Sequence, residues 1–380
     1  MLGEPDHYIH EKYAYQLLFV RWLFERGFRH VGFEMGRASG RRFDRYVTTG
    51  DEKWLRSSAK HNGLAQDLPK GILSVDIDAG WLGNDQRERE SFMRALRAIS
   101  EVRKPRTPPL HVFGFDVDFF VANALEEASS LLEGRPGRAT HAIRSALESS
   151  AGGVDGIVRV RALVSEHAAA LREELGDDRH VELLSSLRET EETARFAAVA
   201  MHEPPLDQLL ESYARREETM FWQVDEQVAR ASAKEGVVLI GHNMHLGKNA
   251  RSIRFGGPDG KPMWPSIGSH VADKLGAKSY AVWMLYAGGT HGHHKCRDLA
   301  CPIDAPPNTV EQRLGELGDR FLLPIRAEDP ATRFLFDEAS FIQNGELGSG
   351  RIGPQADLLV FVRHVRAPDA AGAAELESPR

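Results

Sequence analysis

The chain has 380 residues, of which 42% are hydrophobic and 27% are charged, and its formal net charge is −7. That composition is typical of a globular protein with room for one large domain or two medium ones. The negative charge argues against a nucleic-acid partner, and the lack of an uninterrupted apolar run of ~18 residues argues against a membrane span. The first residues lack the basic and apolar regions of a signal peptide, and two cysteines are too few for a disulfide framework, so a cytoplasmic location is expected.

The first third of the chain alternates predicted helices with predicted strands. The helices cover residues 11–27, 41–60 and 86–103. The first strand, at 29–36, is short and apolar and carries Glu34 near its carboxyl end. A second strand at 110–116 repeats this arrangement with Asp116. Each strand therefore presents a carboxylate at the same end.

The middle of the chain is predicted to be an array of helices. Residues 121–195 contain no aromatic side chain and are rich in Ala, Leu, Glu and Arg, a composition that favours helices. Glycine-rich breaks divide this stretch into about four helices, and a longer helix follows over residues 204–233. We therefore predict an all-helical insertion at 119–233.

The sheet is predicted to resume after the insertion. Its further strands cover residues 236–241, 277–285 and 356–362, with a helix at 269–275. The predicted fold class is α/β, with a mostly parallel central sheet flanked by helices and a large all-helical insertion. Residues 1–118 and 234–366 would form the two parts of the α/β core. Residues 367–380, rich in Ala, Pro and Glu, are predicted to be a disordered tail.

Polar side chains follow several of the predicted strands. The run Gly241-His242-Asn243-Met244-His245 comes directly after an apolar strand, at the edge where open α/β sheets bind their ligands. Glu34 and Asp116 hold corresponding positions, and the start of the chain adds Glu4 and His7. An imidazole beside a carboxylate suits general-base catalysis, because its ordinary pKa of ~6.5 lies near operating pH. A single histidine is more often structural than catalytic, but the two sets together favour a site.

Other patterns leave alternatives open. A metal site is a competing interpretation, built from His7, His10, His242 and His245 with Glu4, Glu11 or Glu34. No His-Glu-x-x-His signature supports it. The segment from His291 to Cys301 is also rich in His and Cys, and it is either a structural or adventitious metal site or none. A basic cluster that begins at Arg37 is either a solvated helix face or an anchor for an anionic group of a substrate.

Five motifs in chain order carry a family resemblance. They are Gly3-Glu4-Pro5-Asp6-His7, then Glu34, then Gly114-Phe115-Asp116, then the pair Arg216 and Met220, and finally Gly241-His242-Asn243-Met244-His245. In this order, from residue 2 to about residue 290, they resemble the erythromycin esterase family. The resemblance implies a single α/β core with a helical insertion and a cleft between them. It also implies metal-independent hydrolysis, without a cofactor, of a small-molecule substrate.

The resemblance assigns roles to individual residues. His7 would activate water, Glu4 and Glu34 would orient or polarise it, and His242 would line the site. The residues predicted to be catalytic are thus Glu4, His7, Glu34 and His242, and those predicted to bind substrate are His10, Arg37, Asp116, Arg216, Asn243 and His245. The predicted function is hydrolysis of an ester or lactone of a small molecule by water. The alternatives are a metallohydrolase that uses the four histidines and a small-molecule-binding member that lacks catalysis.

The chain departs from the family pattern at three points. Tyr8 stands where a glycine is usual after the first histidine, and Gln16 stands where an arginine is usual. Loss of a fixed positive charge would weaken stabilisation of an oxyanion or carboxylate, an effect that can reach ~3 kcal/mol. The family usually has a strand before Gly-Glu, of which only Met1-Leu2 remain. Either the true start lies upstream or the sheet lacks that strand.

Overall fold

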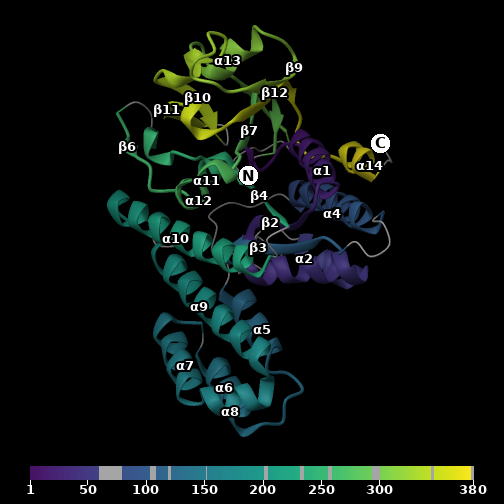
Figure 1. Cartoon of the computed structure of the whole chain (residues 1–380), viewed down its shortest axis with the longest axis vertical. Coiled ribbons are helices and arrows are strands. Elements are labelled where there is room, and N and C mark those ends of the chain that lie inside the picture. Colours follow the sequence, from purple (N-terminus) through teal and green to yellow (C-terminus); the bar gives the residue numbers. More distant parts are fainter. Residues whose placement is uncertain are drawn as a thin grey trace.

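The structure is a computed structural model, and Figure 1 shows a sheet-containing body from which a group of helices extends downward. It describes residues 1–59, 79–102, 108–118, 121–150, 152–200, 204–231, 235–255, 259–292, 300–343 and 346–377. Within these residues, no helix combines the length and the apolar character needed to cross a membrane.

The central sheet is mostly parallel, which confirms the predicted fold class. Its order is β3-β2-β4-β1-β7-β12-β9, and β8 pairs with β7 outside that path. The strands are β1 (Leu2–Glu4), β2 (Phe28–Gly36), β3 (His111–Asp116), β4 (Gly236–His242), β7 (Val282–His291), β8 (Cys301–Asp304), β9 (Arg320–Pro324) and β12 (Leu358–Val365). Only the pairings of β9 and β8 are antiparallel. Apolar runs such as that of β4 are typical of parallel strands buried on both faces.

The strand that precedes Gly-Glu in the family pattern is present, in a short form. β1 pairs in parallel with both β4 and β7, so it occupies the middle of the sheet. Its register places Glu4 opposite His242. The alternative that the sheet lacks this strand is therefore wrong, and the two polar motifs lie side by side because their strands are neighbours.

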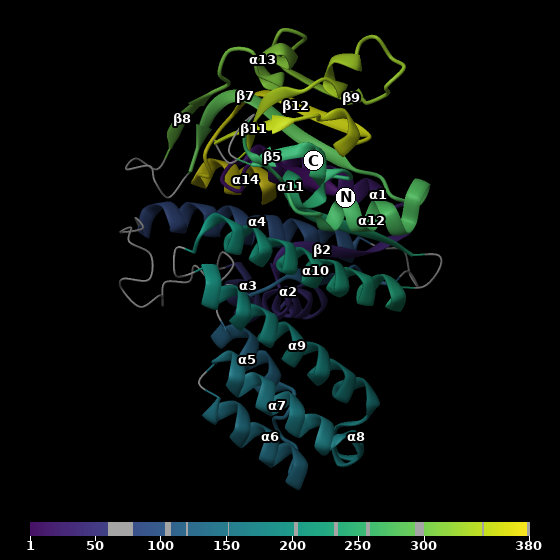
Figure 2. The same ribbon diagram turned by 90° about the vertical axis from the view of Figure 1, so that its left-hand side faces the viewer.

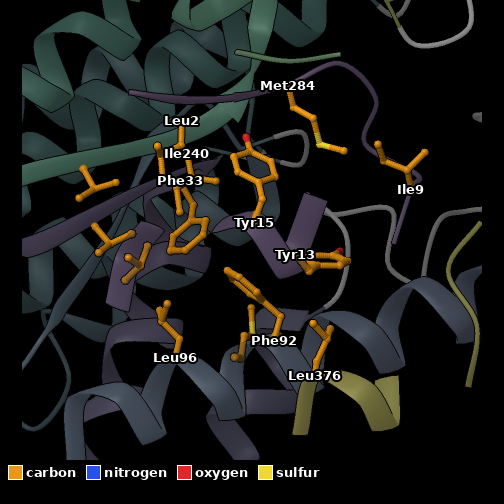
Figure 3. Packing of buried hydrophobic residues seen from close by; sticks show 14 of the residues in the cluster. Leu2, Ile9, Tyr13, Tyr15, Phe33, Phe92, Leu96, Ile240, Met284 and Leu376 are labelled. Atoms are coloured by element: carbon orange, nitrogen blue, oxygen red, sulfur yellow. The ribbon is translucent and has the colours of Figure 1, made fainter. Parts of the chain in front are cut away.

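Helices cover both faces of the sheet. They are α1 (Glu11–Phe24), α2 (Arg37–Thr49), α3 (Glu52–Ala59), α4 (Ala79–Glu101), α11 (Asn243–Leu246), α12 (Ile267–Leu275), α13 (Val310–Gly315) and α14 (Ala370–Glu377). On one face, side chains of β1, β2 and β4 pack against Tyr13 of α1 and Phe92 and Leu96 of α4 (Figure 3). On the other face, Phe115 and Leu239 pack against Met220 and against Ile267 of α12.

Residues 370–377 of the predicted disordered tail form a helix, so the prediction is wrong for that part, and residues 378–380 lie outside the described residues. α14 packs along α4, where Ser91 donates a hydrogen bond of 2.8 Å to Glu377. Ala373 and Leu376 are buried in this contact, and Gly372 allows the close approach to His10. Ala and Glu both favour helices, so the composition is compatible with a helix that packing on α4 stabilises.

The segment between β3 and β4 is helical. It contains α5 (Val121–Ser130), α6 (Arg138–Ser149), α7 (Val154–Glu166), α8 (Ala168–Leu175), α9 (Asp177–Ala200) and α10 (Leu206–Arg230). The first five form a bundle that projects from the sheet and has its own apolar core (Figure 2). α10 packs against β3 and α12, so it also forms part of the layer that covers the sheet.

A second, small antiparallel sheet is a feature that the sequence did not predict. Its order is β10-β11-β5-β6, with β5 (Ile253–Phe255), β6 (Lys261–Pro262), β10 (Ala339–Gln343) and β11 (Glu346–Gly350). These strands are two to five residues long, too short for alternation of apolar and polar residues to be recognised.

Candidate active site

His7 and Glu4 form a hydrogen-bonded pair at the carboxyl end of β1. Nδ1 of His7 lies 2.8 Å from Oε1 of Glu4. A carboxylate can only accept, so Nδ1 carries the proton and donates it. In the neutral imidazole the lone pair is then on Nε2, which lies 3.9 Å from Oε1 of Glu34. The side chain of His7 is 23% exposed, whereas those of Glu4 and Glu34 are almost fully buried.

Two residues of α1 hold Glu4 in its ionised form. Lys12 donates to Oε1 of Glu4 over 3.2 Å and also to the carbonyl of His7, and Gln16 donates to Oε2 over 2.7 Å. Burial by itself would raise the pKa of Glu4, but Lys12 and the hydrogen bonds from His7 and Gln16 hold that pKa well below its usual range. Sequence reasoning missed Lys12, although its i, i+4 spacing with Gln16 puts both residues on one helix face.

We predict that Lys12→Met makes the protein more sensitive to acid. Because the pKa of Glu4 is lowered in the folded state, its contribution to stability is present above the unfolded value of ~4.3 and is lost as pH falls through the folded value. Without the lysine the pKa of Glu4 in the folded state rises. The midpoint of acid unfolding should therefore move to higher pH, by about one pH unit or more. The midpoint of acid unfolding, followed by circular dichroism, measures this. Lys53→Met, which removes an exposed lysine paired with Asp51, should leave the midpoint unchanged, and an unchanged midpoint in Lys12→Met would contradict the prediction.

Glu34 is contacted from three directions. Its Oε2 accepts the backbone N–H of His242 over 2.6 Å. Its Oε1 lies 3.3 Å from Nε2 of His245 and 3.6 Å from Nη2 of Arg216. Gly241 makes room for it, since a Cβ there would lie 2.8 Å from Oε2. Glu34 thus joins β2, β4 and α10 at the sheet edge.

His245 is an imidazolium held between two carboxylates. Nδ1 donates to Glu217, and Nε2 faces Glu34. Burial would lower the pKa of His245, but Glu217 and Glu34 raise it to about 9. Glu217 is fully buried and also accepts from Trp264 and from the backbone of Ile267, over 3.0 and 2.7 Å. The sequence analysis missed Glu217, although it directly follows Arg216 in the family motif.

His242 uses both of its ring nitrogens. Nδ1 accepts the backbone N–H of Met244 at the start of α11, and Nε2 lies 3.2 Å from the carbonyl of Pro5, to which it donates. Burial, together with His7 and His245, keeps the pKa of His242 well below its ordinary value, so the ring is neutral. Its centroid lies 5.1 Å from that of His7. These contacts fix the loop that carries His7.

Of the other predicted site residues, Asp116, Arg216 and Asn243 lie in or beside this cluster, whereas His10 and Arg37 do not. Arg216 pairs with Asp116 through two hydrogen bonds, from Nε over 2.8 Å and from Nη2, and it reaches Glu34 as well. Asn243 is buried and donates to the carbonyl of Met284 over 2.8 Å, so it supports β7.

His10 and Arg37 face partners away from this cluster. Nδ1 of His10 lies 3.0 Å from Glu88 of α4, and Nε2 lies 3.5 Å from Glu375 of α14. Arg37 bonds Glu182 of α9 and Glu226 of α10. His10 and Arg37 are thus bonded to carboxylates outside the cluster, and Nδ2 of Asn243 is bonded to a backbone carbonyl. A substrate-binding role for these three residues stays a prediction. The set of four histidines proposed for a metallohydrolase is not assembled, since His10 points to α4 and α14.

The second His-rich segment is only partly described. His291 is buried at the end of β7, and its Nδ1 lies 2.7 Å from Oδ2 of Asp6. Residues 293–299, which include the other histidines and Cys296, lie outside the described residues. In the part of the chain that the structure describes, no three or more His, Cys, Asp or Glu side chains form a group that could hold a metal ion.

A cavity of about 60 Å³ adjoins the His7–Glu34 pair. Its polar lining comes from Glu4, His7, Lys12, Gln16, Glu34 and Arg89, and its apolar lining from Tyr13, Phe33, Met35, Phe43, Phe92, Met93 and Ile240, with Gly241. The apolar residues come from the sheet and from helices α1, α2 and α4. The cavity thus extends from the polar cluster toward the core beneath α4.

Comparisons with known proteins agree with this arrangement at the level of the fold. The family model for erythromycin esterase matches residues 24–365. Three solved structures are similar: a protein from Bacillus cereus (TM-score 0.73, 16% identity, 97% of this chain and 89% of that chain), a succinoglycan biosynthesis protein (0.66, 13%, 97% and 88%) and a mutant of the erythromycin esterase EreC in its open conformation (0.64, 15%, 97% and 90%). No curated protein sequence matches the chain. At these identities the structural likeness shows the fold alone.

Proposed function

The chain belongs to the erythromycin esterase family, and from this premise we propose that it hydrolyses an ester or lactone of a small molecule with water activated by His7. One observation carries the proposal. The imidazole of His7 donates through Nδ1 to the buried, ionised Glu4, which leaves the lone pair on Nε2 facing Glu34. A histidine oriented in this way by a carboxylate is suited to act as a general base. The family match begins at residue 24, so the role of His7 rests on this geometry and on the motif around it.

The proposed reaction uses only water and the ester. The water oxygen attacks the carbonyl carbon while its proton passes to Nε2 of His7. The tetrahedral intermediate then collapses, the bond to the alkoxy oxygen breaks, and the proton on His7 passes to that oxygen. The products are a carboxylic acid and an alcohol, and His7 returns to its starting form. Glu4 keeps the imidazole in the required tautomer and stabilises the imidazolium that forms.

The positive charges around the pair support this assignment. The imidazolium of His245 and the guanidinium of Arg216 balance the charge of Glu34, which can then orient the second hydrogen of the water. On the other side Lys12 balances Glu4. Gln16, which replaces the usual arginine, donates a hydrogen bond to Glu4 but carries no charge. Lys12 therefore supplies the fixed positive charge beside this carboxylate.

A panel of aryl esters, alkyl esters and lactones tests the proposal. Turnover of at least one compound, lost when His7 is replaced, is the expected result. Tight binding of panel compounds without turnover would instead favour the small-molecule-binding alternative.

A further inference from the structure

The cavity beside His7 is lined by both apolar and polar side chains. Phe33 and Ile240 from the sheet and Phe92 and Tyr13 from the helices line it, and Figure 3 shows their side chains converging. All four are at most 6% exposed. His7 also lines the cavity, and its side chain is partly exposed. An apolar group bound among the apolar side chains is therefore removed from water.

Four of the polar lining residues, Glu4, Lys12, Gln16 and Glu34, already have protein partners. Both carboxylate oxygens of Glu4 accept hydrogen bonds from protein donors, which are His7, Lys12 and Gln16. Glu34 has protein partners at both of its oxygens. An apolar group placed among these side chains leaves their hydrogen bonds intact, so the desolvation cost that usually opposes such a contact is small.

The size of the cavity limits the group that it accepts. An apolar cavity of about 150 Å³ takes a benzene ring, so a volume of about 60 Å³ suits about two or three carbon atoms. Because His7 lines the cavity, a group bound there would lie next to the carbonyl that the water attacks. We propose that the cavity is an acyl pocket that selects esters of short, unbranched aliphatic acids, of propionyl to butyryl size. This inference rests on the proposed function and specifies its substrate class.

An ester series of increasing acyl length tests the pocket. With p-nitrophenyl acetate, propionate, butyrate, hexanoate and octanoate, kcat/KM should rise about four-fold per methylene up to propionate or butyrate, because each buried methylene contributes that factor. It should then fall at hexanoate. Phe92→Leu enlarges the cavity and should move the optimum to a longer chain, whereas Ile240→Phe fills it and should move the optimum to acetate. Unfolding midpoints of both variants show whether they fold.

A binding measurement separates failure of the pocket from failure of the proposed function. Aliphatic amides from acetamide to octanamide, titrated into wild-type protein and followed by NMR, should bind most tightly at propionamide or butyramide. That optimum without any ester turnover would support the pocket and overturn the hydrolase proposal. Ester turnover with no optimum in either series would overturn the pocket and leave the hydrolase proposal standing. The binding series uses only wild-type protein, so it tests the acyl pocket even if Phe92→Leu or Ile240→Phe fails to fold.

Discussion

Replacing His7 with alanine should lower kcat for ester hydrolysis about 10²–10⁴-fold, because that is the usual cost of removing a positioned general base. The loss should be in the chemical step, since the variant removes the proton acceptor and leaves the cavity lined by the same apolar residues. The protein should stay folded. His7 is partly exposed, and Glu4 keeps its hydrogen bonds from Lys12 and Gln16 when the imidazole is absent.

Steady-state kinetics of wild type and variant on one confirmed substrate measure this loss. His30→Ala is the matched control, because His30 is also partly buried but lies near the amino end of β2, away from the site, where it pairs with Glu235. It should retain wild-type kcat. Imidazole added to His7→Ala should restore part of the rate, which a merely structural role would not allow. Activity within about three-fold of wild type would show that His7 is not the base.

Part of the site could be predicted from the sequence because residues at the carboxyl ends of parallel strands meet at one edge of the sheet. Glu34, Asp116 and the histidines after β4 could be placed at one sheet edge because a buried apolar run followed by a polar side chain is a local signal. His7 and Glu4 were added to this set because they belong to the short motif Gly3-Glu4-Pro5-Asp6-His7. These residues meet in the structure because β1, β2, β3 and β4 are neighbours in one sheet.

The remaining contacts depend on pairings that no local pattern encodes. His10 and Arg37 have the chemistry of binding residues, but Glu88, Glu182 and Glu226 engage them, and these partners lie 78 to 189 positions away. The helix α14 was missed because its stability comes from packing on α4. Lys12 was overlooked because a lysine on a predicted helix is usually exposed, and here it is buried against a carboxylate.

The second large effect is expected at Glu217, which anchors the imidazolium of His245. Glu217→Gln should lower the free energy of unfolding by about 3–5 kcal/mol near pH 6, since it leaves a buried cation without one of its carboxylates. The amide also offers only one accepting oxygen, whereas the carboxylate accepts from His245, Trp264 and the backbone of Ile267. Such a loss is a large part of the 5–15 kcal/mol that stabilises a typical domain.

The pH dependence of this loss identifies its cause. The pKa of His245 is about 9 in the folded protein, above its ordinary value, so its contribution to stability is complete below pH ~6.5 and disappears as pH rises through about 9. That shift corresponds to about 3 kcal/mol. In Glu217→Gln the pKa falls, so the difference in unfolding free energy between wild type and variant should narrow steadily from pH 6 to pH 10. Glu218→Gln, at the exposed neighbouring position, should follow the wild-type curve in urea titrations. A difference that stays constant with pH would mean that Glu217 acts only through its neutral hydrogen bonds and that His245 is uncharged.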